Sequence, residues 1–512
     1  MQKPIPHNVS YVTNLLHKAG FEAYLVGGCV RDLVLQDLHQ VSSTDAKALA
    51  DKREPKDWDI ATNATPEQMI PVFEKDNLKV VYENQFGTVS IVFEEESFES
   101  SVREIQITPY RTEGNYSDNR HPDSVSFSTN IHDDLSRRDF TMNAMALHPE
   151  TMELIDPFHG KQSLEKGIIE AVGNPVERFS EDALRIMRAI RFSAQLNIPV
   201  SYETLSAIGE TKDLLNNISV ERIRDEFVKM IDSDNPGIGM FLMKQLGILE
   251  YVIPEIIPSI DCEQGGAHKY DVFDHLVYAL QHAADKQYPF HVKLAALFHD
   301  IGKPKTRRPG HKKAYTFYGH EVVGARITVK IMERMKFPKK DIDIVTTFVR
   351  WHMFFSDTEQ ISLSAVRRMI QNVGKDHIWD LMKVRECDRV GMAKVEAPYR
   401  LRKYFAMIEE CLRDPISVGQ LKIDGNYLIN TLHMKPGRRM GWILHALLEE
   451  VLEDPTKNTV ETLTGRVKDL DELDDKTLQK LGERGREIKE QADNQEVEKL
   501  HMKHKVTKKP VK

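Results

Sequence analysis

The sequence predicts an α+β multidomain protein, in which a mixed sheet with helices is followed by mainly helical domains. Residues 1–150 alternate strand-favouring runs with helical patterns, and helical periodicity dominates beyond residue 150. A length of 512 residues suggests three or four domains rather than one hydrophobic core. Helices are expected near 8–19, 29–36 and 66–75, and strands near 22–27, 57–61, 79–83, 87–93 and 104–110.

The composition is that of an ordinary soluble protein, with 41% hydrophobic and 29% charged residues. The cysteines are scattered and form no C-x-x-C pair, which fits a reducing cytosol. The N-terminus lacks an apolar signal segment and no run of about 18 apolar residues occurs, so neither secretion nor membrane spanning is expected. The predicted location is cytoplasmic, and the oligomeric state is left open.

The charge balance limits the class of nucleic-acid partner. A net charge of −8 and an isoelectric point near 6.2 argue against a protein that coats nucleic acid indiscriminately. A local basic groove remains compatible with this balance, because arginines cluster at 185–191, 367–368 and 438–439. Basic residues on helices are more often only a solvated face.

The segment Tyr24–Asp32 reads as a short apolar strand that ends in Gly27-Gly28 and continues into a helix carrying Arg31 and Asp32. Such a turn presents backbone N–H groups and a helix N-terminus to a phosphate. A Gly-Gly pair on its own is more often just a tight turn. The segment therefore indicates phosphate binding only together with a second signal.

That second signal is the pair Asp57 and Asp59. The two residues lie in a predicted strand, so both carboxylates are expected on one face while Trp58 turns to the other. Two anions that close repel each other unless a cation lies between them. The pair suits Mg²⁺, which takes carboxylate and substrate phosphate oxygens in phosphoryl transfer. A lone Asp-x-Asp is more often a solvated turn.

The glycine-containing segment and the aspartate pair, in this order, resemble the class II tRNA nucleotidyltransferases. These are the CCA-adding enzymes and bacterial poly(A) polymerases of the polymerase-β superfamily. The resemblance implies a polymerase-β-like nucleotidyltransferase head. It also implies that Asp57 and Asp59 are catalytic and bind Mg²⁺, and that the nucleotide contacts Gly27, Gly28, Arg31 and Asp32.

Three further features of the head bear on this resemblance. Asp37–Lys52 separates the two halves of the motif where the family has little spacer, and is interpreted as a surface insertion. Gln106 stands where the family commonly has a glutamate, whereas Arg111 keeps the matching nucleotide-binding position. The polar loop 112–122 resembles the loop that CCA-adding enzymes need for the final A, which weighs against addition of CC alone.

A basic motif follows in the same predicted domain. Arg137 and Arg138 beside Asp139 and Asn143 could form a surface ion pair on a helix, which would contribute little. In company with the predicted metal-binding carboxylates, the segment resembles the family motif that contacts the ribose and triphosphate. The resemblance implies nucleotide contacts by Arg138, Asp139 and Asn143.

The next motif lies on a predicted helix and contains, at intervals of three residues, Asp182, Arg185, Arg188 and Arg191. One interpretation is an intrahelical salt bridge and a basic stripe. The other is a protein template for a nucleobase, in which Asp182 accepts from an exocyclic amine and Arg185 donates to the adjacent ring nitrogen. That pattern fits cytosine and adenine and excludes uracil and guanine. It matches the family's E-D-x-x-R motif, and Glu221–Glu226 resembles the neck motif that steadies this helix.

A different chemistry is predicted for residues 255–395. Histidines and aspartates follow the order H…HD…H…H…D on predicted helices, at His275, His299, Asp300, His320, His352 and Asp388. One interpretation is a helical bundle with satisfied histidines. The other is an HD phosphohydrolase, which the order resembles, with six ligands for Mn, Ni, Co or Fe and with Asp300 bridging two metals. Lys303 could then neutralise a substrate phosphate. Phosphatase or 2′,3′-cyclic phosphodiesterase activity is implied by the resemblance alone.

The C-terminal part carries weaker signals. Residues 400–470 resemble the segment that holds the tRNA elbow in this family, and Lys435, Arg438 and Arg439 at a Pro-Gly turn suit phosphate contact. Residues 471–512 are densely charged, so they are expected to form a solvated helix that frays into a basic tail.

The sequence is thus identified as a member of the tRNA nucleotidyltransferases with an attached HD domain. The expected domains are a head (1–150), a helical neck (151–250), an HD domain (255–395), a tRNA-binding body (400–470) and a charged tail (471–512). The implied activity is template-independent addition of C, C and A from CTP and ATP to the tRNA 3′ end, with release of pyrophosphate. Alternatives are an A-only enzyme, a poly(A) polymerase, or an HD nucleotide phosphohydrolase with a non-catalytic RNA-binding head.

Overall fold

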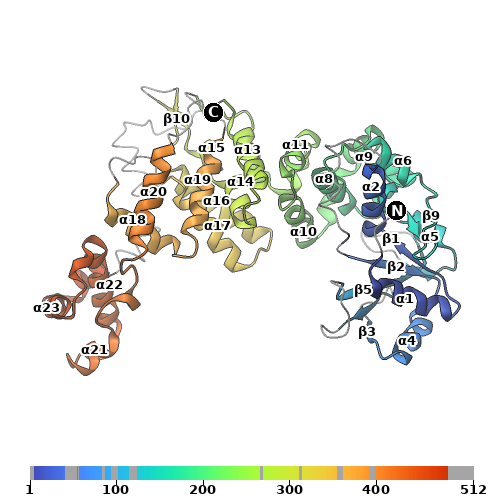
Figure 1. Ribbon diagram of the computed structural model, residues 1–512. Helices are drawn as coiled ribbons and strands as arrows, with labels where there is room; N and C mark the ends of the chain where they lie inside the picture. Colours follow the sequence, from blue (N-terminus) through green and yellow to red (C-terminus); the bar gives the residue numbers. More distant parts are fainter. Residues whose placement is uncertain are drawn as a thin grey trace. The chain divides into compact units, whose positions relative to one another are not determined.

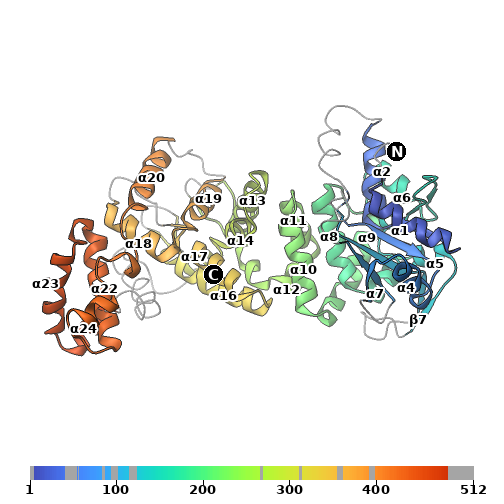
Figure 2. The ribbon, with the colours of Figure 1, turned by 60° about the horizontal axis from the view of Figure 1, so that its bottom comes forward.

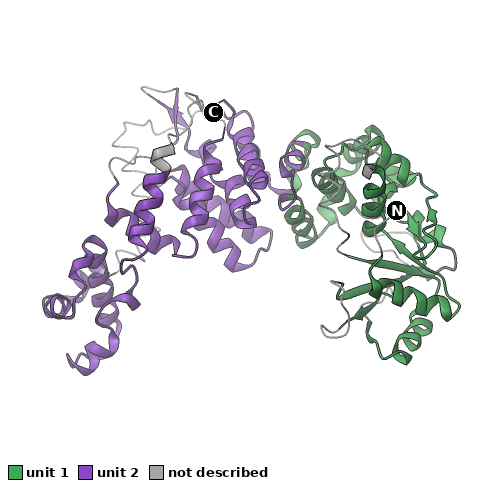
Figure 3. Cartoon of the chain, in the orientation of Figure 1, with its two compact units in different colours: residues 1–230, 242–251 green, residues 231–241, 252–512 purple. Residues whose placement is uncertain are grey.

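The computed structural model describes residues 5–40, 55, 57–82, 87–93, 102–114, 124–265, 269–310, 314–353, 361–390 and 398–482. The chain divides into two compact units, Met1–Met230 with Leu242–Tyr251 and Ile231–Phe241 with Val252–Lys512 (Figure 3). The first unit combines a sheet with helices, and the second is almost entirely helical (Figures 1 and 2). The α+β multidomain prediction is confirmed. Within the described ranges, no helix combines the length and the apolar character needed to cross a bilayer.

The first unit is built on a seven-stranded mixed sheet with the strand order β3-β4-β5-β2-β1-β8-β9. The pair β2 and β5 is parallel, and all other neighbours are antiparallel. A separate two-stranded sheet pairs β6 with β7. The strands are β1 (Ala23–Val26), β2 (Asp59–Thr62), β3 (Lys79–Tyr82), β4 (Val89–Val92), β5 (Glu104–Pro109), β6 (Arg111–Glu113), β7 (Val125–Phe127), β8 (Ala146–Leu147) and β9 (Leu154–Ile155).

The sequence pattern explains how the sheet carries functional groups. In β5, Ile105 and Ile107 are buried while Glu104 and Gln106 are exposed, which is the period-2 alternation of a strand covered on one face. The helix α4 (Pro66–Lys75) begins with a capping box between Thr65 and Gln68. The helices α1 (His7–Lys18) and α2 (Gly28–Gln40) both contact β1.

The predicted elements of the first 93 residues are found, with two differences. The strand predicted over 57–61 begins only at Asp59, and Asp57 lies in a bend before it, so the two carboxylates do not share a strand face. The helix predicted over 29–36 continues as α2 to Gln40, into the segment interpreted as a surface insertion. Residues 41–52 of that segment lie outside the described residues, as does most of the predicted loop 112–122.

Helices complete the first unit. The single helix predicted around residues 179–192 is wrong: α7 ends at Glu181, Asp182 has an extended backbone (φ −138°, ψ 101°), and α8 begins at Leu184. Asp182 and Arg185 are therefore not one turn apart on a continuous helix. The helices of this part of the chain are α5 (Ile131–Ser136), η1 (Thr141–Asn143), α6 (Gly160–Lys166), α7 (Pro175–Glu181), α8 (Leu184–Leu196), α9 (Tyr202–Thr211), η2 (Lys212–Asn217), α10 (Val220–Ile231), α11 (Pro236–Leu246) and α12 (Leu249–Val252). Of their residues, Ile231, 236–241 and Val252 belong to the second unit.

The second unit packs helices around a buried polar centre. A Cβ atom on Gly302 would lie 2.2 Å from the His320 carbonyl oxygen, so only glycine allows these segments to approach this closely. Its helices are η3 (Pro254–Ser259), α13 (Val272–Asp285), α14 (Phe290–Phe298), α15 (Lys303–Thr306), α16 (His320–Arg334), α17 (Lys339–Trp351), α18 (Leu363–Val373), α19 (Ile378–Asp388), α20 (Pro398–Cys411), η4 (Val418–Gln420), α21 (Gly425–Asn430), α22 (Arg438–Glu453), η5 (Pro455–Lys457), α23 (Val460–Asp471) and α24 (Asp475–Gly482), with a small hairpin of β10 (Arg308–Pro309) and β11 (Tyr315–Thr316).

Candidate functional site

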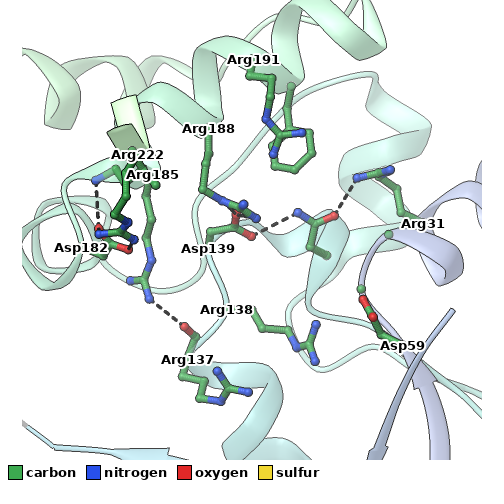
Figure 4. A pocket seen from close by; sticks show the side chains of 15 residues that line it. Arg31, Asp59, Arg137, Arg138, Asp139, Asp182, Arg185, Arg188, Arg191 and Arg222 are labelled. Atoms are coloured by element: carbon green, nitrogen blue, oxygen red, sulfur yellow. Dashed lines mark hydrogen bonds and ion pairs between the residues drawn. The ribbon is translucent and has the colours of Figure 1, made fainter. Parts of the chain in front are cut away.

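A pocket of about 460 Å³ lies in the first unit (Figure 4). Seven arginines and three aspartates dominate its wall, so it suits a polyanionic ligand. The volume is in the range of small-molecule and cofactor sites. The lining residues are Gly27, Gly28, Arg31, Asp59, Arg137, Arg138, Asp139, Asn143, Asp182, Leu184, Arg185, Arg188, Arg191, Phe192 and Arg222.

Most residues predicted to bind the nucleotide come together in this pocket. Of the described residues, those lining it do not include Asp57, Asp32 or Arg111. Asp32 instead accepts a hydrogen bond from Arg31 Nε at 2.9 Å, and Arg111 begins β6. Asp59 and Asp182 lie on opposite sides of the same pocket (Figure 4).

The strand–turn–helix predicted for the glycine segment forms one edge of the pocket. β1 ends at Val26, Gly27 adopts a left-handed φ of +76°, and α2 begins at Gly28. A Cβ atom on Gly27 would lie 3.1 Å from Arg138 Nη1 and 3.6 Å from Asp59 Oδ2. Glycine thus allows the turn, the arginine and the carboxylate to approach one another.

The Asp59 carboxylate is partly buried. Burial raises its pKa, the Arg138 guanidinium opposes this, and the neighbouring Asp57 carboxylate raises the pKa further. In the sheet, Asp59 pairs directly with Gln106 of the parallel strand β5. Gln106 therefore places an amide where the nucleotidyltransferase family commonly has a glutamate. The carboxylates predicted to bind Mg²⁺ are then those of Asp57 and Asp59.

A buried carboxylate that the sequence reasoning missed organises the basic wall. Asp134 accepts from Arg137 Nη2 at 2.6 Å and from Arg138 Nη2 at 2.9 Å, and its side chain is 1% exposed. Burial alone would raise the Asp134 pKa, but Arg138 and Arg137 hold it below its usual value. Asp134 therefore fixes two arginines of the pocket wall by charge-assisted hydrogen bonds.

We expect Asp134→Asn to raise the KM for a nucleoside triphosphate roughly tenfold and to destabilise the fold by about 3 kcal/mol, because it leaves two arginines without their shared anion. Steady-state kinetics and thermal unfolding measure the two effects. Asp133→Asn is the matched control, since Asp133 lies in the same helix and accepts from Ser128 Oγ at 2.6 Å. Equal kinetics for the two variants would contradict the role of Asp134.

A chain of hydrogen bonds links Arg31 to Asp139 among the residues that line the pocket (Figure 4). Arg31 Nη1 donates to Asn143 at 3.0 Å, Asn143 Nδ2 donates to Asp139 at 3.1 Å, and Arg188 Nε donates to Asp139 at 2.7 Å. Burial would raise the Asp139 pKa, but Arg188 and the Asn143 amide lower it to about 2. Asp139 is thus an anchoring anion between the head motif and the neck helix.

Phe192 is another lining residue that the sequence reasoning missed. The guanidinium carbons of Arg31, Arg188 and Arg191 lie 5.4, 5.4 and 4.0 Å from the centre of its ring. Arg191 also donates to Glu226 of α10 at 2.5 Å. The segment predicted to steady the neck helix does so through this pair.

Asp182 and Arg185 face the pocket, but each is held by other partners. Asp182 accepts from Leu184 N and from both terminal nitrogens of Arg222, at 3.1, 3.3 and 2.7 Å. The guanidinium of Arg185 donates to Glu181 at 2.5 Å and to the carbonyl oxygens of Arg178 and Arg137 at 2.8 and 3.0 Å. Glu181 and Arg222 were both absent from the predicted site, since each acts through a partner.

The second unit brings all six predicted HD residues together. They form two groups that could each hold a metal ion, and both groups contain Asp300: His275, His299, Asp300 and Asp388, and Asp300, His320 and His352. Asp300 Oδ2 lies 3.3 Å from His299 Nε2, whereas Asp300 Oδ1 lies 3.1 Å from His320 Nε2. The two oxygens of one carboxylate thus face different groups.

The histidine orientations fit a cation. All four Nδ1 atoms lie against backbone carbonyl oxygens, those of Val390, Ala296, Phe317 and Val349, at 2.7–3.2 Å. Carbonyls only accept, so Nδ1 carries the proton and each Nε2 presents a lone pair inward. The Nε2 atoms of His275 and His299 are only 3.1 Å apart, which a shared cation would stabilise. The donor set of imidazoles and carboxylates suits a divalent transition metal.

Lys303 is the basic neighbour of this centre. Its Nζ atom lies 2.5 Å from Asp300 Oδ2 and donates to Gln264 Oε1 at 2.6 Å. Although burial would raise the Asp300 pKa, the Lys303 ammonium holds it well below its usual range. The carboxylate is therefore ionised and available as a ligand.

Several arginines that were predicted to contact RNA form ion pairs with acidic residues of the chain itself. Arg439 donates to Asp471 at 2.9 Å and to the carbonyl oxygens of Asp471 and Leu473, and it also contacts Asp475. Arg367 and Arg368, considered for a basic groove, pair with Asp414 and with Glu449 and Glu453. Lys435 and Arg438 are exposed.

Family models match three parts of the chain. Residues 23–170 match the poly(A) polymerase head domain, 197–260 the probable RNA and SrmB-binding site of polymerase A, and 272–387 the HD domain. The seven-stranded sheet, which lies within residues 23–170, is thus of the poly(A) polymerase head class.

Curated relatives define the family more closely. A CCA-adding enzyme of Lactobacillus helveticus is 31% identical over 471 residues, which cover 90% of this chain and 96% of the relative. The chain therefore belongs to the family of CCA-adding enzymes. A CCA-adding enzyme of Limosilactobacillus reuteri is 42% identical over 240 residues, so the match spans 47% of this chain and about half, 53%, of that relative.

Solved structures share the fold. The Bacillus stearothermophilus CCA-adding enzyme in complex with CTP superposes with a TM-score of 0.65 at 23% identity, covering 92% of this chain and 98% of that one. The Thermotoga maritima CCA-adding enzyme complexed with tRNA gives a TM-score of 0.52 at 19% identity, covering 90% and 95%.

Proposed function

We propose that the chain is a template-independent tRNA nucleotidyltransferase that adds C, C and A, from CTP and ATP, to the tRNA 3′ end. The observation that carries this proposal is the single pocket that joins Asp59, the arginine wall, and the Asp182 and Arg185 pair. A nucleoside triphosphate has the matching parts: a reacting phosphate, a polyanionic tail and a base edge. The family membership supports the same activity.

The reaction joins the tRNA 3′ oxygen to the α-phosphorus and breaks the bond to the departing pyrophosphate, while the hydroxyl proton passes to solvent. Asp57 and Asp59 would hold Mg²⁺, which when bound neutralises charge on the reacting phosphates. Arg31 and Arg138 bind the triphosphate by charge-assisted hydrogen bonds. The remaining arginines of the wall stabilise the same charge.

Base selection follows from a count of free donors and acceptors. A carboxylate has about four lone-pair sites, and Asp182 has three of them occupied, which leaves one acceptor on Oδ2. The guanidinium of Arg185 has three N–H groups engaged, which leaves Nε–H and one Nη2–H. Cytosine and adenine present an amine next to a ring acceptor and complement this set. Uracil and guanine place a carbonyl oxygen against the carboxylate.

In this proposal, the C-terminal helices contact the tRNA. The Thermotoga maritima relative was solved with tRNA, and exposed Lys435 and Arg438 at the start of α22 suit backbone phosphates. Because A-form helices expose little base information, shape and backbone contacts dominate the recognition of the tRNA.

The test uses three tRNA substrates, ending before CCA, after C and after CC, each incubated with one nucleotide. CTP should extend the first by two residues and the second by one, and ATP should extend only the third. Extension of the third substrate alone would identify an A-only enzyme. Long A tails on unrelated RNA would identify a poly(A) polymerase.

We also propose a metal-dependent phosphohydrolase activity in the second unit, because Asp300 turns one oxygen toward each histidine group. Manganese, nickel, cobalt or iron would fit these ligands, in two positions bridged by Asp300. When bound, such a metal supplies an activated water for attack on a phosphate ester. Lys303 neutralises charge on that phosphate.

A further inference from the structure

The second unit buries a positive charge beside its two metal-ligand groups. Arg385 lies on α19, and its side chain is only 7% exposed. Its Nη1 atom donates to Asp388 Oδ2 at 2.5 Å, three positions further along the same helix. Its Nε atom is buried and has no hydrogen-bond partner among the described residues. Removing a guanidinium from water is unfavourable unless an anion compensates it, and here the anion is Asp388.

The two oxygens of Asp388 serve different partners. Oδ1 lies 3.4 Å from His299 Nε2 and 3.7 Å from His275 Nε2, so it belongs to the first metal-ligand group. Oδ2 is the oxygen that Arg385 contacts. A carboxylate can bind a metal through one oxygen or through both. Because the guanidinium already holds Oδ2, Asp388 offers a metal Oδ1 alone.

Arg385 differs in this respect from the other buried cation of the centre. Lys303 Nζ contacts Asp300 Oδ2, and this same oxygen lies 3.3 Å from His299 Nε2. A metal in the first group and Lys303 therefore compete for one oxygen. Arg385 meets the outer oxygen of Asp388, so it can keep its contact when Oδ1 binds a metal.

This contact has two consequences for a metal in the first group. Binding through one oxygen leaves a coordination position that chelation by both oxygens would fill, and a catalytic metal needs such a position for water or substrate. The fixed guanidinium also repels the metal, since both are cations. Arg385 thus favours an open but weaker site.

We propose that Arg385 is a positioning residue of the metal centre: it holds Asp388 Oδ2 so that Asp388 binds a metal through one oxygen and the site stays open. The inference rests on the proposed phosphohydrolase activity and assigns control of the metal position to a residue that is not itself a ligand. Loss of Arg385 should therefore tighten metal binding and slow hydrolysis. Loss of a merely structural residue would weaken both.

The test compares Arg385→Met with the wild-type full-length chain. Both are stripped with a chelator and titrated calorimetrically with cobalt, in excess Mg²⁺ that occupies the aspartate pair of the first unit. We expect the affinity of one cobalt position to rise about tenfold, because the competing charge is gone. The position formed by Asp300, His320 and His352 does not contain Asp388 and should keep its affinity. We expect kcat for bis(p-nitrophenyl) phosphate to fall about tenfold.

Two conservative variants separate the charge of Arg385 from its hydrogen bond. Arg385→Lys keeps a cation that can reach the carboxylate three positions on, so it should restore most of the wild-type affinity and hydrolysis. Arg385→Gln keeps a donor without the charge, so it should bind cobalt more tightly than the wild-type chain. The matched control is Lys383→Met. Lys383 lies on the same helix and donates to Asp380 at 2.7 Å, and it should change neither readout.

Cobalt binding that is equal to or weaker than wild type in a folded Arg385→Met variant overturns the proposal, as does unchanged hydrolysis. Equal effects in Lys383→Met overturn it as well. If thermal unfolding shows that Arg385→Met is not folded, Arg385→Gln decides, and unchanged or weaker binding counts against the proposal.

The wild-type chain separates this inference from the proposed activity. Cobalt binding without hydrolysis contradicts the phosphohydrolase function, and the affinities of the Arg385 variants then decide the role of Arg385 alone. Hydrolysis by the wild-type chain, with no change in the Arg385 variants, contradicts the role of Arg385 and leaves the activity standing. A wild-type chain that binds no cobalt contradicts both.

Discussion

Asp59→Asn is expected to reduce nucleotide incorporation by roughly 10³-fold or more, because removal of a group that acts only in the transition state lowers kcat directly. The asparagine amide is a poor ligand for Mg²⁺, and Gln106, the neighbour of residue 59 in the sheet, carries an amide rather than a carboxylate. Single-turnover incorporation of CTP on tRNA measures the loss.

The stability of the Asp59→Asn variant should not fall with its activity. Burial and Asp57 raise the Asp59 pKa in the folded chain, so the folded state binds this proton more tightly than the unfolded chain does. The ionised group therefore lowers stability in full above its folded pKa, and this penalty shrinks as the pH falls through the folded pKa and is gone below the ordinary pKa. We expect Asp59→Asn to unfold at the same temperature or higher at neutral pH. Glu74→Gln, an exposed acid on α4, is the control. A folded Asp59→Asn variant with normal incorporation would refute the metal-binding role.

Asp300→Asn is expected to abolish phosphodiester hydrolysis and to remove bound metal, while tRNA extension stays at the wild-type level. The loss should be complete because one carboxylate serves both histidine groups. Hydrolysis of bis(p-nitrophenyl) phosphate and metal content by mass spectrometry measure the two effects. Retention of wild-type metal content would show that Asp300 is not a shared ligand.

The design must separate metal loss from unfolding. Asp300→Asn leaves the buried ammonium of Lys303 without its anion, and breaking such a pair destabilises by about 3 kcal/mol. The double variant Asp300→Asn with Lys303→Met restores the charge balance and should also lack metal. Asp341→Asn, which removes a partner of His291 elsewhere in the same unit, should keep both metal and hydrolysis.

Local signals predicted much of the fold and of both sites. The strand, glycine turn and helix around Gly27 follow from periodicity and from the one residue type that accepts a left-handed φ. The six HD residues were found because each stands at a helix end or face in a fixed order along the chain. The first feature depends on neighbours in sequence, and the second on an order of residue types that resembles the HD phosphohydrolases.

The features that were missed depend on partners far along the chain. Glu181-Asp182-Ala183 contains neither glycine nor proline, so nothing local predicts the break between α7 and α8, where Arg222 holds the Asp182 carboxylate. Asp134 is an exception: its partners Arg137 and Arg138 are near in sequence, but the sequence does not show that this carboxylate is buried beneath them. Arg439 looked like a phosphate contact, but the aspartates that engage it lie more than thirty residues away. A pattern of residue types does not reveal such pairings.

The way in which Asp182 and Arg185 present one acceptor and two donors has a practical consequence. Under the proposed base reading, the site contacts only the Watson–Crick edge, so it would ignore substituents elsewhere on the base, such as halogens or dyes at pyrimidine C5 or purine C8. Tagged cytidine and adenosine triphosphates should therefore be incorporated where natural ones are, which would turn the protein into a reagent for marking transfer RNA at its terminus.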